Sequence, residues 1–311
     1  MADAIAITGP TAAGKTVLAV AVAQRLHGEI ISFDSRQVYR GMDIGTAKPT
    51  LEARGGVPHH GFDLVEPDER FNAGRFAALA RDWTADSQAR GRTPVLVGGT
   101  GFFLRALTHP LFEEPELDPA RKEAWKKYLA TVPTAELARW AALLDPGASV
   151  RPADRQRLAR VIETAQLTGR PLSWWQRQAP PHRPAAPLLV VVLDLPRDEL
   201  YRRIDERVDA MVRAGLVDEV RALLARGYSE RDPGMNATGY VEMVPYLRGE
   251  YDLAHAVELI ARATRRYARR QITWLRHQLP PGALWLDGML PAGRLADDIA
   301  QRWLAASATR T

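Results

Sequence analysis

Residues 4–16 read AIAITGPTAAGKT. Residues 4–7 form a short apolar run, which is typical of a buried parallel strand. Residues 15–27 continue with an apolar pattern that predicts a helix, ending near Gly28. Between strand and helix lies the phosphate-loop pattern, in which two glycines spaced by four residues precede Lys-Thr. Its members are Gly9, Pro10, Thr11, Ala12, Ala13, Gly14, Lys15 and Thr16.

This loop has a direct chemical interpretation. Its glycines let successive backbone N–H groups turn inward to phosphate oxygens, and the helix N-terminus adds a positive dipole end. Lys15 supplies a point charge, and the Thr16 hydroxyl can hold Mg²⁺. The alternative is an ordinary glycine loop, but the preceding strand and following helix favour a phosphate site. The motif does not distinguish a nucleoside triphosphate from an isoprenyl diphosphate.

Beyond this segment, the pattern of the chain predicts an open parallel α/β sheet with ligands at the carboxyl ends of its strands. Further strands are expected at residues 30–33, 94–97 and 188–193, with a helix at 75–89. Residues 113–187 break the alternation: they are helical in pattern and end in a proline-rich stretch. We interpret them as a helical insertion into a core formed by residues 1–112 and 188–311, which is helical again after Leu195.

Composition narrows the functional classes. The 311 residues are 46% hydrophobic and 25% charged, typical of a globular protein, and contain no cysteine, which excludes disulfides and thiolate metal sites. No apolar run approaches the roughly 18 residues of a membrane span, and no signal peptide is evident. We expect a cytoplasmic monomer. The net charge of +5 favours a polyanionic partner only weakly.

Two polar positions follow predicted strands. Asp34 can accept a proton from a nucleophile, although Asp-Ser is also common in turns and helix caps. Thr100 lies in Gly98-Gly99-Thr100-Gly101, where it can donate to a leaving-group oxygen. The glycines either allow close backbone approach or simply form a strand-to-helix turn, and the sequence favours neither.

Arginine placement indicates phosphate or RNA contacts. Residues 261–279 hold six arginines and no acidic residue, together with Tyr267 and Trp274, a combination that suits RNA. The alternative is that the aromatic residues are core and the arginines solvated. Arg203 and Arg207 share a helix face, so one can reach a diphosphate, although a salt-bridged solvated face is the commoner arrangement.

The pair at residues 59–60, His-His, has no third metal ligand at a suitable spacing, which favours a structural role.

Taken in order, these segments resemble the bacterial tRNA dimethylallyltransferases, the IPP transferase family. The most specific matches are residues 41–49, GMDIGTAKP, and residues 269–276, RRQITWLR. The other matching segments, besides the phosphate loop, are 34–39, 58–60, 98–100, 154–160 and 203–209.

The resemblance implies an α/β fold with a P-loop NTPase- or kinase-like parallel sheet, and an insertion that grips the anticodon stem-loop of tRNA. It implies a prenyltransferase that moves a dimethylallyl group from dimethylallyl diphosphate to N6 of adenosine 37, in tRNAs reading codons that start with U. Mg²⁺ is the implied cofactor, and no obligate protein partner or membrane is expected.

The resemblance also assigns roles. Asp34 is expected to be the general base or hydrogen-bond acceptor for the amine. Thr100 and Arg207 are expected to stabilise the diphosphate, with Lys15 and Thr16 in the phosphate loop. The expected tRNA contacts are Asp34, Ser35, Arg36, Gln37, Thr100, Gln156, Arg157, Leu158, Ala159, Arg160, Gly239, Tyr240, Arg269, Arg270, Gln271, Trp274 and Arg276.

The chain departs from the family pattern at two positions. Val241 stands where a basic residue is usual, and Phe103 where a tyrosine is usual.

Two other functions compete with prenyl transfer. A P-loop kinase would leave residues 41–49 and 269–276 without a role, and a non-catalytic RNA-binding protein would be indifferent to Asp34→Ala.

Overall fold

The computed structural model describes residues 3–109, 117–178, 188–279 and 282–308 of the chain. It divides into two compact units, residues 1–108 with 184–311, and residues 109–183. The insertion boundaries expected from sequence, 112/113 and 187/188, fall in or at the edge of segments 110–116 and 179–187, which lie outside the described residues. The two units are described separately.

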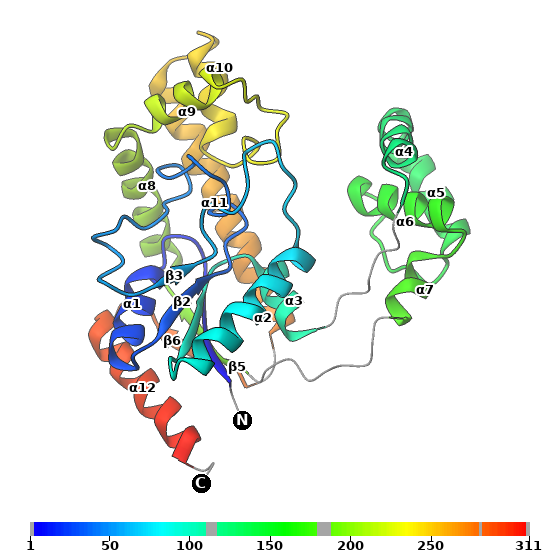
Figure 1. The fold of residues 1–311 in the computed structure, drawn as a ribbon. Coiled ribbons are helices and arrows are strands. Elements are labelled where there is room, and N and C mark those ends of the chain that lie inside the picture. The colour runs from blue at the N-terminus through cyan, green and yellow to red at the C-terminus, as the bar shows by residue number, and fades with distance from the viewer. Residues whose placement is uncertain (1–2, 110–116, 179–187, 280–281, 309–311) are drawn as a thin grey trace. The chain divides into compact units, whose positions relative to one another are not determined.

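A parallel sheet forms the larger unit (Figure 1). All four predicted strands are confirmed, as β1 (Ala4–Thr8), β2 (Glu29–Ser32), β4 (Pro94–Val97) and β5 (Leu188–Asp194). Two more strands complete the order β3-β2-β4-β1-β5-β6, and every neighbouring pair is parallel. The expectation of a purely helical chain after Leu195 is therefore wrong, because β6 (Leu284–Asp287) pairs with β5; the other added strand is β3 (His59–His60).

Helices surround this sheet and extend beyond it. The two predicted helices appear as α1 and α2, within two residues of their expected bounds. The described helices of this unit are α1 (Lys15–Arg25), α2 (Ala73–Ala89), α3 (Gly101–Thr108), α8 (Arg197–Arg213), α9 (Leu216–Ala225), α10 (Tyr240–Leu247), α11 (Leu253–Gln278) and α12 (Ala292–Ala308). Among the described residues, none of the helices combines the length and apolar character that crossing a membrane requires.

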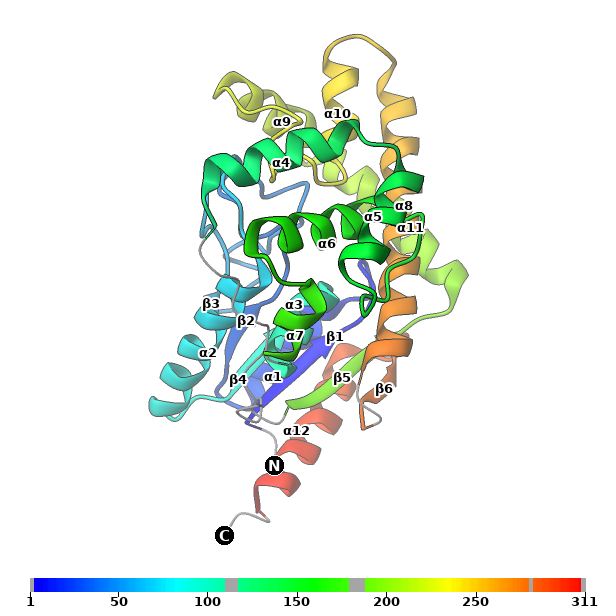
Figure 2. The same ribbon diagram turned by 90° about the vertical axis from the view of Figure 1, so that its right-hand side faces the viewer.

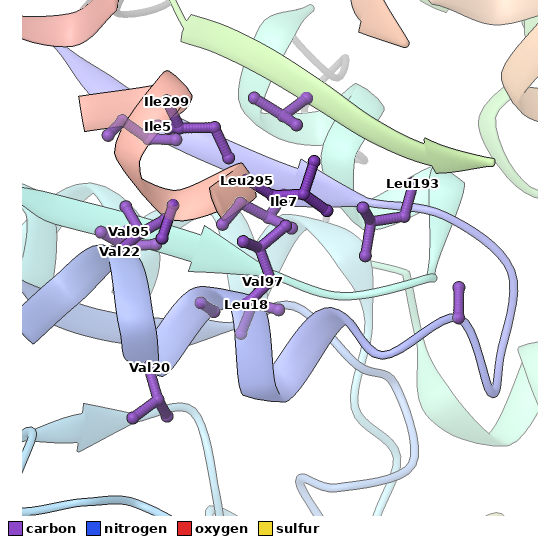
Figure 3. Packing of buried hydrophobic residues seen from close by; sticks show 14 of the residues in the cluster. Ile5, Ile7, Leu18, Val20, Val22, Val95, Val97, Leu193, Leu295 and Ile299 are labelled. Atoms are coloured by element: carbon purple, nitrogen blue, oxygen red, sulfur yellow. The ribbon is translucent and has the colours of Figure 1, made fainter. Parts of the chain in front are cut away.

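The main hydrophobic core lies under α1 and α12. Ile5 and Ile7, two residues apart in β1, point to the same face of the sheet and pack against Leu18 of α1 and Ile299 of α12 (Figure 3). Because β1 is central and fully buried, its carboxyl end is held rigidly where the phosphate loop begins. The fold therefore fixes the position of that loop.

A second core joins the helices remote from the sheet. It unites α8, α9, α10 and the first half of α11 with the loops after β2, and includes Val38, Met42 and Tyr240. Helix α11 contributes Ile260 to this core and Ala268 to the core under the sheet, so one 26-residue helix runs from one to the other (Figure 1, Figure 2). Helix α11 therefore connects the two cores.

The insertion unit has a core of its own, around Leu137, Leu158 and Val161. Asp118 and Asp154 cap two of its helices with their side chains. Its described helices are α4 (Pro119–Thr131), α5 (Thr134–Leu144), α6 (Arg155–Thr168) and α7 (Leu172–Arg177), with no described strand, as its sequence predicted.

Candidate active site

The phosphate loop, residues 9–16, leaves β1 and enters α1 as predicted. Gly9 has φ +145, and a Cβ there would lie 2.7 Å from the Leu193 carbonyl oxygen, so only glycine fits against β5. Gly14, with φ +86, is the N-cap residue of α1, and no side chain caps the helix. The first N–H groups of α1 are therefore left for an anion.

A pocket of about 330 Å³ opens over this loop. Thr11, Ala12, Gly14, Lys15 and Thr16 line one side of it. The other lining residues come from α1, from the carboxyl ends of β2 and β4, from the loop after β2, and from α8 and α11. They are Val17, Asp34, Gln37, Ala47, Val97, Gly98, Gly99, Arg203, Arg207, Tyr267 and Gln271.

Three of the four predicted catalytic residues thus line one pocket: Lys15, Asp34 and Arg207. Thr100 directly follows the lining residue Gly99, and its hydroxyl oxygen accepts a hydrogen bond from the Ser35 backbone N–H at 3.0 Å. The four residues come from four separate parts of the chain, and the parallel sheet brings their segments to the same edge.

The charges in the pocket perturb one another. Burial, and next the charge of Arg207, lower the pKa of Lys15 to about 8, against the opposing effect of Asp34. Burial likewise lowers the pKa of Arg207, while Asp34 raises it. Burial and the charge of Asp34 raise the pKa of Tyr267 to about 12, so its hydroxyl stays protonated. Lys15 and Arg207 are two positive charges close together, and such a pair favours a polyanionic ligand.

We expect the affinity of the pocket for inorganic diphosphate to fall as pH rises through 8. A lysine with pKa about 8 is half protonated at pH 8 and about one-tenth protonated at pH 9, so the dissociation constant should rise roughly fivefold across that interval. Calorimetric titration from pH 7 to 9 measures this. Lys15→Arg is the control, because its charge persists and the dependence should flatten; a wild-type constant unchanged over this range contradicts the assignment.

Gln271 connects the phosphate loop to the glycine segment that follows β4. Its side-chain oxygen accepts from the Thr11 N–H at 2.8 Å, and its amide nitrogen donates to the Gly99 carbonyl at 2.9 Å. A Cβ on Gly99 would lie 2.3 Å from that nitrogen, and one on Gly101 would lie 2.3 Å from the Trp274 ring. Gly99 and Gly101 therefore allow close approach to α11, and Gly98 allows close approach to Phe33. The same segment also forms the turn from β4 into α3, so both alternatives left open by the sequence hold.

The Asp34 segment is fixed by its own backbone and by a distant loop. Asp34 accepts from the Arg36 N–H at 2.8 Å, as an Asx turn would, so the turn and the catalytic alternatives are compatible. The Arg36 guanidinium donates to the Pro233 carbonyl at 2.9 Å and to Asn236 at 2.9 Å. Gln37 donates to the carbonyl of Ala47, another lining residue, at 3.1 Å.

Glu219 organises the segment 41–49, a role that the sequence did not reveal. Its carboxylate accepts the N–H groups of Asp43, Ile44 and Gly45 at 2.7–3.0 Å. It also accepts the hydroxyl of the fully buried Tyr240 at 2.6 Å. Lys48, whose side chain is 4% exposed, bridges Asp43 of the same segment and Asp63 of a later loop. Glu219 lies on α9, more than 170 residues from Asp43, Ile44 and Gly45, so no local pattern could have identified this role.

The expected tRNA contacts on α11 and at the start of α10 fall into two groups. Arg269, Arg270 and Arg276 are exposed on α11, as an RNA-binding surface requires. Gln271, Trp274 and Tyr240 instead pack inward, and Gly239 precedes α10 with φ +100. Tyr240 is fully buried, so this structure exposes no part of it to RNA.

In the insertion, the expected contacts lie on the first turns of α6. Gln156 and Arg157 are exposed, and Arg157 lies 3.4 Å from Asp154. Ala159 and Arg160 are half-buried, whereas Leu158 belongs to the core. The nearby Arg155 donates to the carbonyls of Leu129 and Ala130 at the end of α4, which is a structural role.

The two departures from the family pattern lie outside the pocket. Phe103 is buried and stacks on Phe76 with ring centroids 4.6 Å apart. Val241 is 39% exposed in the first turn of α10. The two histidines make local contacts, His59 Nδ1 with the Val57 carbonyl at 2.7 Å and His60 Nε2 with Glu29 at 3.0 Å. No cluster of three His, Asp or Glu residues suitable for a metal occurs in the described part of the chain.

Comparison with known proteins gives consistent matches along the chain. The profile described as IPP transferase matches residues 37–278, and that described as isopentenyl transferase matches residues 2–56. The chain is 47% identical over 301 residues to a tRNA dimethylallyltransferase of Anaeromyxobacter dehalogenans, covering 96% of this chain and 99% of that protein. It is 45% identical over 284 residues to that of Magnetococcus marinus, covering 89% and 92%.

Solved structures agree with the fold. The tRNA isopentenylpyrophosphate transferase of Bacillus halodurans has a TM-score of 0.71 at 37% identity, over 97% of this chain and 95% of that one. A eukaryotic dimethylallyltransferase, described as acting on tRNA, has a TM-score of 0.80 at 27% identity, over 98% of this chain and 78% of that one.

Proposed function

The chain belongs to the IPP transferase family, and on this premise we propose that it transfers a dimethylallyl group from dimethylallyl diphosphate to N6 of adenosine 37 in tRNAs that read codons starting with U. Prenyl transfer to tRNA follows from the family and its relatives. The diphosphate donor and the adenosine acceptor are the parts we propose. One observation carries them: a pocket whose lining combines two crowded cations, Lys15 and Arg207, with the carboxylate of Asp34.

The cationic groups of the pocket suit the donor. The N–H groups at the start of α1, Lys15 and Arg207 would bind the diphosphate. The Thr100 hydroxyl, which donates to Ser35 Oγ at 3.3 Å, would turn to donate to an oxygen of the leaving group. An allylic carbon tolerates positive charge, so much of the barrier lies in the departure of the diphosphate. Groups that stabilise its growing charge therefore accelerate the reaction.

The carboxylate of Asp34 suits the acceptor. An adenine amine is a weak nucleophile, so it needs placement and a proton acceptor. The N6 nitrogen attacks the allylic carbon, the carbon–oxygen bond to diphosphate breaks with its electron pair going to oxygen, and the amine proton passes to Asp34. The adenosine must leave the stacked loop to enter the pocket, as in base-flipping enzymes.

Mg²⁺ fits the oxygen ligands of this pocket. Thr16 and Asp34 line it together, and hydroxyl and carboxylate oxygens are the ligands this ion prefers, with the diphosphate supplying others. We propose that Thr16 holds the ion, which when bound would neutralise part of the diphosphate charge.

We also propose a cytoplasmic location, where the tRNA substrate of the family is found.

Transfer of labelled dimethylallyl from its diphosphate to tRNA tests the proposal. The tRNA carries adenosine at positions 36 to 38, and a variant with guanosine at 37 is the matched control. We expect label in the first tRNA only. A parallel reaction with γ-labelled ATP should leave the tRNA unlabelled. Phosphorylation without prenyl transfer would mean that the pocket binds phosphate but uses a different donor.

A further inference from the structure

A second hollow, of about 780 Å³, lies beyond the catalytic pocket in the same unit. It opens at the carboxyl ends of β5 and β6, between the first turn of α8 and the last turns of α11. None of the residues that line the catalytic pocket borders it. The mechanism proposed above makes no use of this hollow.

Three guanidinium groups border the hollow: Arg197 of α8, and Arg269 and Arg276 of α11. All three residues are exposed, and none has a carboxylate partner among residues 3–109, 117–178, 188–279 and 282–308. Their neighbours differ, because Arg203 is paired with Glu199 and Arg265 with Asp205. Unpaired guanidinium groups gathered at one hollow favour a phosphate ligand.

Aromatic surfaces lie beside these cations. Trp285 of β6 is 40% exposed, unusually so for a tryptophan in a strand. Tyr201 also lines the hollow, with the Arg197 guanidinium 5.1 Å from its ring centroid. An exposed indole next to arginines is the combination that stacks on a nucleobase while the adjoining phosphates are neutralised.

Two carboxylates complete the lining. Asp194 ends β5 and Asp287 ends β6, and in each the Oδ1 atom accepts a backbone N–H, from Leu195 at 3.1 Å and from Met289 at 2.9 Å. The Oδ2 atoms accept no hydrogen bond within the described chain, so they can accept ribose hydroxyl groups. A hydroxyl acceptor beside a phosphate binder favours RNA over other polyanions.

The hollow and the catalytic pocket lie against opposite faces of α11. At 100° per residue, Tyr267 and Gln271 share the face toward the catalytic pocket, while Arg269, Ile272 and Arg276 project to the other side. A helix is about 10 Å across. One RNA molecule is therefore large enough to place one nucleotide on each side of it.

We propose that this hollow binds a second ribonucleotide of the tRNA, apart from the adenosine that is modified. Trp285 stacks on its base, Arg197, Arg269 and Arg276 engage its phosphates, and the two aspartates accept its ribose hydroxyls. The inference rests on the proposed function, because it takes tRNA as the polyanion.

Arg197→Ala and Trp285→Ala test this site, because neither residue lies on α11 or in the catalytic pocket. In prenyl transfer each should raise the KM for tRNA five- to twentyfold, with kcat and the KM for dimethylallyl diphosphate unchanged. Arg197→Ala should also reduce the slope of log KM against log salt by about one. Trp285→Phe keeps an aromatic face and should retain most of the affinity.

Arg92→Ala is the control, since Arg92 is exposed before β4 at the amino end of the sheet, and it should change neither KM nor salt slope. Thermal melting of every variant separates loss of fold from loss of contact. Unchanged tRNA KM in folded Arg197→Ala and Trp285→Ala overturns this inference alone, whereas absence of transfer by the wild type overturns the proposed function. Binding of AMP that Arg197→Ala weakens, with tRNA KM unchanged, would also overturn it, because the ligand is then a free nucleotide.

Discussion

Asp34→Asn should lower kcat for prenyl transfer by about a hundredfold to ten-thousandfold, because the amine loses its proton acceptor. Asparagine keeps the side-chain oxygen that accepts the Arg36 N–H, so the turn should survive while the negative charge is lost. Steady-state transfer assays measure the effect on kcat, and circular dichroism shows that the fold is retained. A variant with kcat within threefold of the wild type would exclude Asp34 as the base.

The same substitution has a second readout at Lys15. The charge of Asp34 raises the pKa of Lys15, so its removal should move that pKa further below 8. The fall in diphosphate affinity should then begin at a lower pH than in the wild type. A change of kcat without this displacement would place Asp34 near the amine but away from the lysine.

Arg207→Met should lower kcat by about a hundredfold to a thousandfold, because the departing diphosphate loses a partly buried cation. Methionine keeps much of the side-chain volume. Arg202→Met is the matched control: this exposed arginine on the same helix pairs with Glu199 and Glu206, and its loss should leave kcat unchanged. Equal losses in both variants would mean that α8 had been disturbed and that Arg207 had no specific role.

The two active-site substitutions should displace the Lys15 pKa in opposite directions. Arg207 lowers that pKa, so Arg207→Met should raise it above 8, whereas Asp34→Asn should depress it. Diphosphate titrations of both variants across pH 7 to 9 make the comparison. A shift of both in the same direction would contradict the arrangement of charges described for the pocket.

The sequence predicts those parts of the molecule whose causes are local. The phosphate loop is specified within residues 4–16, and β1, β2, β4 and β5 are short apolar runs with clear ends, so all were predicted correctly. In contrast, β3 has two residues, and β6 alternates over only four, which is too short for a pattern to identify either.

What the sequence does not predict depends on contacts distant along the chain. Glu219 holds the loop at 43–45, and Gln271 holds Thr11 across 260 residues, so neither role has a local pattern. Gln271 and Trp274 lie within an arginine-rich segment and were expected to face RNA. Only the fold reveals that their side of α11 faces the glycines at 99 and 101.

Gln271 has a thermodynamic consequence for the affinities of the two substrates. Its amide joins α11, which carries the exposed arginines, to the Thr11 N–H of the phosphate loop. Any displacement of α11 by RNA therefore alters the site of the donor, and linkage requires the donor to alter the affinity for RNA by the same factor. The two substrates share one coupling free energy, so a dissociation constant for either is defined only at a stated occupancy of the other.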